Sequence, residues 1–304
     1  MGDTLYDTDL VIIGGGPAGC AAARMAASVG MRSVLVEPDR LCRNLYRISA
    51  LNNVLGGYTG GPELAEAIVA ELKGTELCRL ELGRYVTGLR ADDDRVTVTL
   101  DTGASLTAPY AVVATGVGPL QPSDATWITA PAGLMLPALW QADADDAQGR
   151  TLLVLGGDRP IGTFLRAHPT TDTRLLVAYP ATDEYKIDEI REDSRVTLLP
   201  VDHLTLHGGE GAPLSAEVVG RDGVHRTVTA DAVFLSLGSA PAAPPGDLTR
   251  GPDGYCPPAD QHPRVIVAGD LRSARFQRIM TALGSGSEAA LCAYYASRDL
   301  PLKG

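Results

Sequence analysis

The chain has 304 residues, enough for about two domains that each bury a sizeable hydrophobic core. Its 26 basic and 37 acidic residues give a net charge of −11, which disfavours nucleic acid and anionic membranes as partners. The N-terminus has no basic segment ahead of its first apolar run, and no signal or transmembrane segment is predicted. We therefore expect a cytoplasmic protein without a nucleic-acid or membrane partner.

Cysteine and histidine residues show no spacing that is typical of a metal site. The five cysteines contain no C-x-x-C pair, and the five histidines are scattered. Cys20 and Cys292 fall on apolar faces of predicted helices and are expected in the core. We expect no bound metal. The cysteines are Cys20, Cys42, Cys78, Cys256 and Cys292.

The first motif is a short apolar strand that runs into a glycine turn and an alanine-rich helix, residues 11–19 and onward. Its glycines have the G-x-G-x-x-G spacing of a dinucleotide-binding turn. Gly14 permits the tight turn, Gly16 lets the backbone approach a pyrophosphate, and Gly19 lets the helix pack closely on the strand. A plain glycine turn between strand and helix is the alternative.

The second strand supplies the context that this motif requires. It is expected over residues 32–36 and ends at Glu37, whose carboxylate is placed to accept a hydrogen bond from a ribose 2′-hydroxyl. Strand, turn, helix, strand and acid together predict a bound adenine dinucleotide.

A glycine-rich loop follows over residues 52–61, with four glycines in six residues. These glycines would let the backbone lie close to a ligand, and a surface loop is the alternative. Pro62 then opens an amphipathic helix, residues 62–72. The next alternating runs predict an antiparallel excursion, with an exposed acidic turn at residues 92–94. These runs are residues 81–89, 96–100 and 105–108.

The buried strand that begins at Tyr110 ends in Ala114-Thr115-Gly116 and is expected to close the first nucleotide-binding domain. A second strand and glycine turn begin at Thr151, but this turn is damaged. Aligning Gly157 with the middle glycine places Leu155 first and Pro160 third.

The strand after this second turn, residues 174–178, also departs from the motif. It is followed by Tyr179-Pro180, with neither an acid for a 2′-hydroxyl nor an arginine cluster for a 2′-phosphate. The second unit is therefore expected to keep the fold and to have weakened or lost nicotinamide-cofactor binding.

Later segments complete both units. Four strands near residues 196–199, 203–206, 216–219 and 227–229 finish the second. Residues 231–238 return the chain to the first, whose last strand spans residues 264–270. A helix over residues 275–297 holds Gly284 and Gly286, which suggest close packing.

We predict an α/β fold of two Rossmann-like three-layer domains, the second inserted in the first. The first dinucleotide-binding domain is residues 1–117 with 239–304, and the degenerate domain is residues 118–238.

Taken together, the glycine turn, Ala-Thr-Gly, the degenerate turn and the terminal Gly-Asp resemble the low-molecular-weight thioredoxin reductase-like flavoproteins of the pyridine nucleotide-disulfide oxidoreductase superfamily. The resemblance covers nearly the whole chain. Shorter motifs around Arg43-Asn44, residues 53–56 and residues 277–286 look most like the gliotoxin- and holomycin-type dithiol oxidases.

This resemblance implies FAD in the first domain and a homodimer. It places the final acid beside the ribityl phosphate and the start of the last helix at the flavin pyrimidine. The cofactor-binding residues expected from the turn and from the resemblance are Gly14, Gly16, Pro17, Ala18, Gly19, Glu37, Arg43, Asn44, Asn53, Val86, Thr115, Gly116, Gly269, Asp270, Phe276, Gln277 and Ala282.

The chain departs from this family at two places. Where the family's redox C-x-x-C is expected, residues 139–142 read Leu-Trp-Gln-Ala, so two electrons cannot pass to a disulfide by thiol exchange there. The arginine pair that holds the NADPH phosphate in the family falls near Ala178 and Tyr179. The sequence thus disfavours NAD(P)H as a cofactor.

Three functions follow as hypotheses. The first is an FAD-dependent oxidase or dehydrogenase that takes a hydride from a small organic substrate and reduces dioxygen, in small-molecule biosynthesis. The second is an NAD(P)H-dependent flavin reductase similar to cysteine-free ferredoxin–NADP reductases, and the third is a non-catalytic FAD-binding partner protein. No catalytic base is evident. The candidate pocket residues are Cys42, Arg43, Tyr58 and Trp140, of which Cys42, Tyr58 and Trp140 are the candidates for catalysis.

Overall fold

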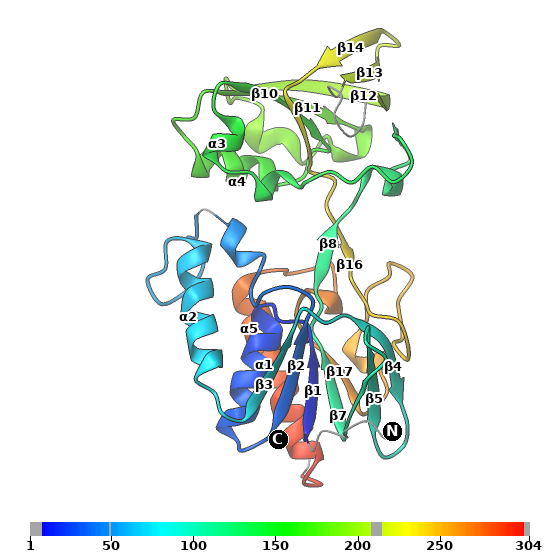
Figure 1. Cartoon of the computed structure of the whole chain (residues 1–304). Helices are drawn as coiled ribbons and strands as arrows, with labels where there is room; N and C mark the ends of the chain where they lie inside the picture. Colours follow the sequence, from blue (N-terminus) through cyan, green and yellow to red (C-terminus); the bar gives the residue numbers. More distant parts are fainter. Residues whose placement is uncertain (1–7, 49, 208–214, 301–304) are drawn as a thin grey trace. The chain divides into compact units, whose positions relative to one another are not determined.

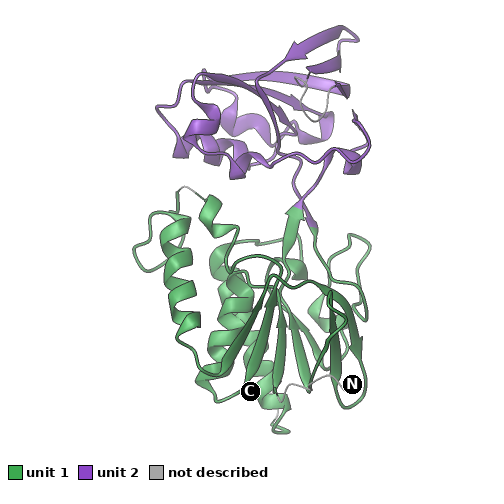
Figure 2. Ribbon diagram, viewed as in Figure 1, with its two compact units in different colours: residues 1–118, 241–304 green, residues 119–240 purple. Residues whose placement is uncertain are grey.

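The computed structural model divides into two compact units, residues 1–118 with 241–304 and residues 119–240 (Figure 2). The residues that the structure describes are 8–48, 50–207 and 215–300.

The first unit is built on a five-stranded parallel sheet in the order β17-β7-β1-β2-β3 (Figure 1). Strands β1 and β7 are fully buried, as expected for a parallel sheet covered on both faces. A three-stranded antiparallel sheet, β4-β5-β6, belongs to the same unit. The strands are β1 (Leu10–Ile13), β2 (Ser33–Glu37), β3 (Cys78–Leu82), β4 (Val86–Ala91), β5 (Val96–Leu100), β6 (Ser105–Ala108), β7 (Tyr110–Val113) and β17 (Val265–Val267).

Alternation along β1 divides this unit into three layers. Leu10 and Ile12 pack in one core with residues of the helices, whereas Val11 and Ile13 pack in a second core with residues of the antiparallel sheet. The helices are α1 (Pro17–Ser28), α2 (Gly61–Lys73) and α5 (Ile279–Ala296).

Helices α1 and α5 lie side by side at very short range (Figure 1). A Cβ added to Gly286 would lie 1.9 Å from the carbonyl oxygen of Ala18, and one added to Gly19 would lie 1.8 Å from that of Gly14. Next to Gly286, the Ser285 hydroxyl accepts a hydrogen bond of 2.9 Å from the backbone N–H of Gly269. The close packing expected from the glycines of the last helix is therefore confirmed at Gly286 but not at Gly284, where an added Cβ would meet nothing within 4 Å.

Some predicted boundaries in this unit are wrong, because the backbone turns where the side-chain pattern continues. The run over residues 81–89 is two strands, since Gly83 adopts a left-handed conformation with φ of 71°. The last helix begins at Ile279 rather than at residue 275, because Phe276 has a φ of 61°. The last strand ends at Val267, and Gly269–Arg272 form a 3₁₀ turn.

The second unit has parallel strands β15-β10-β11-β12, continued by antiparallel β13 and β14, and β9 pairs with β12. Two short strands predicted near residues 196–199 and 203–206 are one long strand, with a register irregularity between Val201 and His203. The elements are β9 (Ile128–Thr129), β10 (Arg150–Leu155), β11 (Thr173–Tyr179), β12 (Val196–His207), β13 (Ser215–Gly220), β14 (His225–Thr229), β15 (Ala232–Leu235), α3 (Ala144–Ala147) and α4 (Pro160–Ala167).

The chain passes between the units through two short strands, β8 (Val117–Pro119) and β16 (Ser239–Pro241), which pair with each other. Both units follow the strand, glycine turn, helix and strand pattern, so the predicted α/β fold class is confirmed. Within the described ranges, no helix is long and apolar enough to cross a membrane.

The two glycines of α5 give a matched test of this packing. Gly286→Ala should lower the free energy of unfolding by about 1–3 kcal/mol, because its new Cβ has no room against α1. Gly284→Ala, in the same helix, has no atom within 4 Å of the new Cβ and should raise that free energy by about 0.5–1 kcal/mol. Chemical denaturation of both variants checks this, and equal effects would contradict the proposed contact.

Candidate functional site

The glycine turn after β1 leaves its outer face clear of side chains. Gly14 has a φ of 102°, and a Cβ there would lie 2.6 Å from the carbonyl oxygen of Ala114. Gly16 is the N-cap of the twelve-residue helix α1, and a Cβ there would meet nothing within 4 Å. Pro17 occupies the first helical position, where no N–H is needed. The turn thus combines a helix N-terminus with open space, the geometry that phosphate groups need.

The acid at the end of β2 lies against this turn. Oε2 of Glu37 accepts a hydrogen bond of 2.7 Å from the backbone N–H of Gly15, and Oε1 accepts one of 3.1 Å from the backbone N–H of Asp39. The structure therefore brings Glu37 to the place that the motif predicts.

Thr115 and Gly116 stand at the end of the adjacent strand β7. The Oγ1 atom of Thr115 is buried and has no hydrogen-bond partner in the protein. Gly116 has a φ of 65°, with no atom within 4 Å of an added Cβ. Buried hydroxyls without a partner are rare, and a bound nucleotide would supply one. These residues fit an adenine dinucleotide such as FAD.

The final segment of the first unit adds Gly269 and Asp270 in the 3₁₀ turn after β17. Burial raises the pKa of Asp270 to about 6, although nearby Arg278 opposes the shift. Gln277 is held by its amide, which donates to the hydroxyl of Tyr255 at 3.2 Å and to the carbonyl oxygens of Asp270 and Ser273. These three hydrogen bonds of Gln277 therefore hold the loop before α5 in place.

Phe276 projects from that fixed loop. The residue is 81% exposed, and its backbone is in the left-handed region, which is an outlier for a bulky residue. The Thr281 hydroxyl donates to the carbonyl oxygen of Phe276 and holds it there. Ala282, by contrast, is buried at the start of α5.

The remaining predicted residues of the first unit do not all gather at the turn. Arg43 is half exposed and pairs with Asp39 at 3.6 Å, while Asn44 and Asn53 are exposed and Val86 is half-buried. Cys42 does reach the turn, because its backbone N–H donates to the carbonyl oxygen of Gly15 at 2.8 Å, and its side chain is buried.

Among the candidates for catalysis, Cys42 and Tyr58 belong to the first unit and Trp140 to the second. The ring of Tyr58 lies over Gly56, where an added Cβ would lie 2.8 Å from it. Trp140 is half-buried beside the fully buried Leu139. No single unit brings all three side chains together.

The glycine turn of the second unit has a different register from the one that its sequence suggests. The N–H of Gly156 donates to Ala178 at 2.8 Å, as that of Gly14 donates to Val36, so Gly156 is the first glycine. Asp158 therefore stands where the first unit has Gly16, and Arg159 is an additional residue before α4. The predicted alignment on Gly157 is wrong because it did not allow for this extra residue.

An acid that the sequence pattern does not reveal lies at this second turn. Oδ2 of Asp183 accepts a hydrogen bond of 3.1 Å from the N–H of Gly157, the counterpart of the contact made by Glu37. Lys186 lies 2.9 Å from Asp183 and 3.9 Å from Asp158. Asp183 comes four positions after the end of β11, in a 3₁₀ turn, so no fixed spacing in the sequence marks it.

Two arginines also lie near the end of β11, contrary to the expectation of no cluster. The guanidinium of Arg221 lies 5.1 Å from the ring of Tyr179, but both Arg221 and Arg191 pair with Glu184. Because Glu184 and Asp188 together pair with these two arginines and the Asp158 carboxylate stands at the turn, the second turn does not fit a dinucleotide pyrophosphate.

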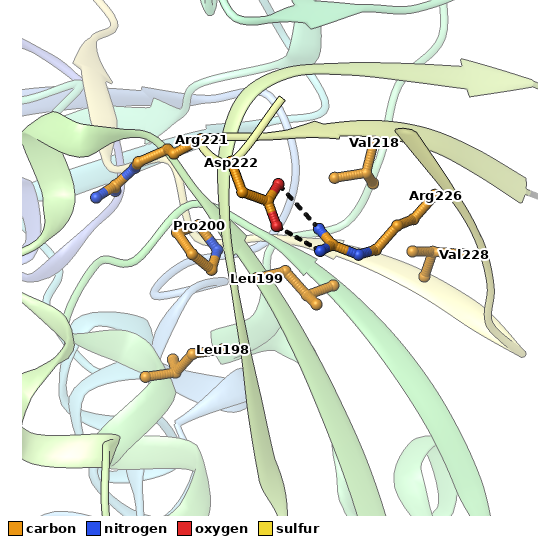
Figure 3. A pocket seen from close by; sticks show the side chains of 8 residues that line it. All are labelled: Leu198, Leu199, Pro200, Val218, Arg221, Asp222, Arg226 and Val228. Carbon is orange, nitrogen blue, oxygen red and sulfur yellow. Dashed lines mark hydrogen bonds and ion pairs between the residues drawn. The ribbon is translucent and has the colours of Figure 1, made fainter. Parts of the chain in front are cut away.

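A cavity of about 530 Å³ lies on the antiparallel part of the second unit (Figure 3). Its charged groups are already paired, since Arg226 forms a two-point ion pair with Asp222 and Arg221 pairs with Glu184. It therefore presents mainly an apolar surface. The lining residues are Leu198, Leu199, Pro200, Val218, Arg221, Asp222, Arg226 and Val228.

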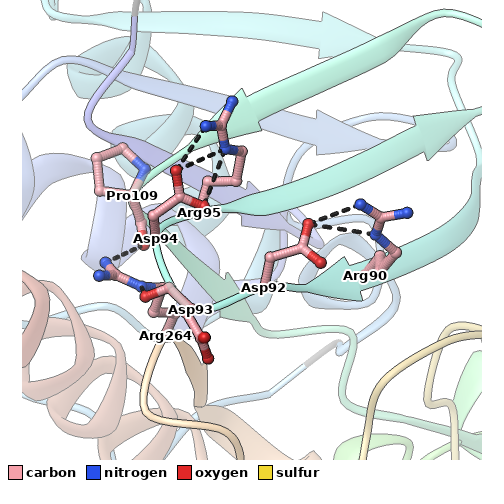
Figure 4. Close-up of polar contacts among 7 residues, drawn as sticks. All are labelled: Arg90, Asp92, Asp93, Asp94, Arg95, Pro109 and Arg264. Carbon is pink, nitrogen blue, oxygen red and sulfur yellow. Dashed lines mark hydrogen bonds and ion pairs between the residues drawn. The ribbon is translucent and has the colours of Figure 1, made fainter.

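The acidic turn between β4 and β5 is structural (Figure 4). Asp92 and Asp94 pair with Arg90 and Arg95, and Arg264 donates to the carbonyl oxygen of Asp93 at 2.7 Å. Across the part of the chain that the structure describes, no group of three or more His, Cys, Asp or Glu side chains is arranged to hold a metal ion.

Comparison with known proteins agrees with this geometry. Residues 8–157 match the family model "Pyridine nucleotide-disulphide oxidoreductase". An NADH dehydrogenase of Ferdinandcohnia aciditolerans is 25% identical over 308 residues, which cover 94% of this chain and 57% of that protein. An alkyl hydroperoxide reductase component of Staphylococcus aureus strain MSSA476 is 23% identical over 312 residues, covering 94% and 58%. The chain thus spans less than three fifths of the length of these curated relatives.

Solved structures share the fold. Thioredoxin reductase from Lactococcus lactis superposes with a TM-score of 0.79 at 20% identity, covering 97% of this chain and all of the other. The protein HlmI superposes with a TM-score of 0.58 at 22% identity, covering 98% and 95%. The chain therefore has the thioredoxin reductase-like fold of two nucleotide-binding domains, and residues 8–157 carry the match to the pyridine nucleotide-disulphide oxidoreductase family.

Proposed function

We propose that this protein is an FAD-dependent oxidoreductase that oxidises a small organic substrate directly at the flavin and passes the electrons to dioxygen. The observation that carries the proposal is the difference between the two glycine turns. Gly16 leaves the first turn open, whereas Asp158 places a carboxylate at the equivalent position of the second. One nucleotide site is thus suited to its cofactor, and the other is not.

In the first unit, the chain's own groups are suited to hold FAD. The turn at Gly14 and Gly16 would face the pyrophosphate, Glu37 would exchange its contact with Gly15 for one with the ribose, and the buried hydroxyl of Thr115 would gain a partner. Bound FAD supplies a two-electron acceptor for a hydride. The protein would then orient the substrate against the flavin and exclude water from the site.

The second unit argues against a nicotinamide cofactor as the electron source. The N–H of Gly157 already donates to Asp183, and the nearby Asp158 carboxylate would repel a pyrophosphate. Lys186 is engaged with the same two acids. Electrons then have to come from the substrate itself.

A disulfide substrate relayed through a thiol pair is also disfavoured. The five cysteines contain no C-x-x-C, and Leu139, in the segment where the family motif is expected, is fully buried in the core of the second unit. Without adjacent thiols, two-electron exchange with a disulfide has no attacking and resolving sulfur at this position. We infer a homodimer acting on a small molecule in biosynthesis, in line with the resemblance.

A flavin reductase that uses NAD(P)H is the second candidate. One observation favours it, because Asp183 contacts the second turn as Glu37 contacts the first. An acid in that position is placed to bind the ribose of a nicotinamide nucleotide. The two candidates differ in their electron donor, which is directly measurable.

The open space at Gly16 gives the first test. Gly16→Asp should keep the fold, because a Cβ there meets nothing within 4 Å, but should abolish copurification of flavin through charge repulsion. Gly284→Asp adds the same charge at an exposed position of α5 and should retain the flavin. Flavin absorbance per protein and circular dichroism are measured together. Full flavin content in a folded Gly16→Asp protein would contradict the assigned site.

The electron donor gives the second test. Anaerobic mixing of the flavin-loaded protein with NADH or NADPH should leave the visible flavin absorbance unchanged, while photoreduction should bleach it. Rapid bleaching by either nucleotide would instead favour the reductase. If the flavin stays oxidised, small organic substrates are screened for hydrogen peroxide production under air.

A further inference from the structure

Two cysteine side chains meet beneath the glycine turn of the first unit. Sγ of Cys20, on α1, lies 3.8 Å from Sγ of Cys42, in the loop after β2. Each residue is only 1% exposed. They are 22 positions apart in the sequence, so no C-x-x-C motif marks the pair.

Both cysteines are tied to one carbonyl group of the turn. The thiol of Cys20 donates to the carbonyl oxygen of Gly15 at 3.3 Å, and the backbone N–H of Cys42 donates to the same oxygen at 2.8 Å. The N–H of Gly15 itself donates to Glu37. The thiol pair and the acid that faces the nucleotide therefore meet at a single residue of the turn.

The loop that carries Cys42 differs from the helix that carries Cys20 in backbone conformation and in exposure. Cys42 has a φ of 55°, an unfavourable conformation for a residue with a side chain, and the next residues, Arg43 and Asn44, are exposed. Cys20, by contrast, is fixed within a packed helix. Small local openings of the loop can therefore admit a small oxidant and let the two sulfurs approach.

We propose that Cys20 and Cys42 are a redox pair that forms a disulfide on exposure to hydrogen peroxide, linking α1 to the loop after β2. In this reaction, one thiolate attacks the peroxide to give a sulfenic acid and water or hydroxide. The second thiol then displaces that oxygen as water and forms the sulfur–sulfur bond. Overall, two thiols and one hydrogen peroxide give one disulfide and two waters.

The disulfide would tie the loop after β2 to α1 beside Gly15, whose backbone N–H contacts Glu37. Since Arg43 and Asn44 follow Cys42 directly, the link would also hold these two residues near the turn. The oxidised protein should therefore release its flavin more slowly. In the proposed function, hydrogen peroxide comes from oxidation of the substrate by dioxygen, so this source of peroxide rests on that function. Formation of the disulfide by added peroxide does not rest on it.

The rate should depend on pH, because the attacking species is a thiolate. Contact with Cys42 and burial raise the pKa of Cys20, and Cys78 and Glu37 are the other titratable groups that raise it. The neutral form of the Cys20 thiol therefore predominates near pH 7. Disulfide formation should be slow there and should accelerate as the pH rises toward about 9.

The test treats the purified full-length protein, with its flavin, with hydrogen peroxide at about pH 7 and about pH 9. Thiols counted after denaturation should fall from five to three. Peptide mapping without reductant should identify a Cys20–Cys42 cross-link, and the flavin should dissociate several-fold more slowly than from the reduced protein.

Cys78→Ser is the matched control, because Cys78 is also buried and is the other thiol, besides Cys42, that raises the pKa of Cys20. It should still form the cross-link, whereas Cys20→Ser and Cys42→Ser should not. If either of these variants fails to fold, mapping of the unmodified protein decides the question alone. Five remaining thiols, a cross-link to Cys78, or oxidation of single cysteines without a cross-link would each overturn the proposal. Reduction of the flavin by NAD(P)H in a protein that still forms the cross-link would instead count only against the proposed function.

Discussion

The first unit depends on the approach of backbone to backbone around its glycine turn. At Gly19 and Gly286 a single methyl group would lie within 2 Å of a carbonyl oxygen, at 1.8 and 1.9 Å. This contact holds α1 on β1 and α5 on α1, and it sets the direction in which the N-terminus of α1 points. Such contacts are intolerant of added atoms because protein cores are packed to near crystalline density. The geometry of the candidate nucleotide site depends on this close approach.

The second unit shows the same frame with different chemistry. Its first glycine repeats the hydrogen bond to the neighbouring strand, and Asp183 repeats the contact of Glu37. Asp158 then places a carboxylate at the turn, 3.9 Å from the Lys186 ammonium, and Arg159 is an additional residue before α4. A fold of this kind can be kept while its ligand site is lost, because the sheet and helices are stabilised by apolar burial rather than by the turn's polar face.

The candidate nucleotide site and the thiol pair meet at Gly15. Its N–H contacts the acid predicted to bind ribose, and its carbonyl oxygen receives hydrogen bonds from both cysteines. A change of state in the thiol pair would thus be transmitted to the nucleotide site through one short stretch of backbone. In the same unit, burial rather than a charged partner raises the pKa of Asp270.

The sequence by itself determined the fold class, the first glycine turn and its acid Glu37, and the close packing of the last helix, because local spacing and glycine content encode these features. It misplaced the boundaries at Gly83 and Phe276, since left-handed residues leave little periodic signal. Only the tertiary structure decided the register of the second turn, the acid Asp183 and the pairing of Cys20 with Cys42. Those depend on an extra residue in a turn and on loops folding back over many positions, and no fixed spacing records such contacts.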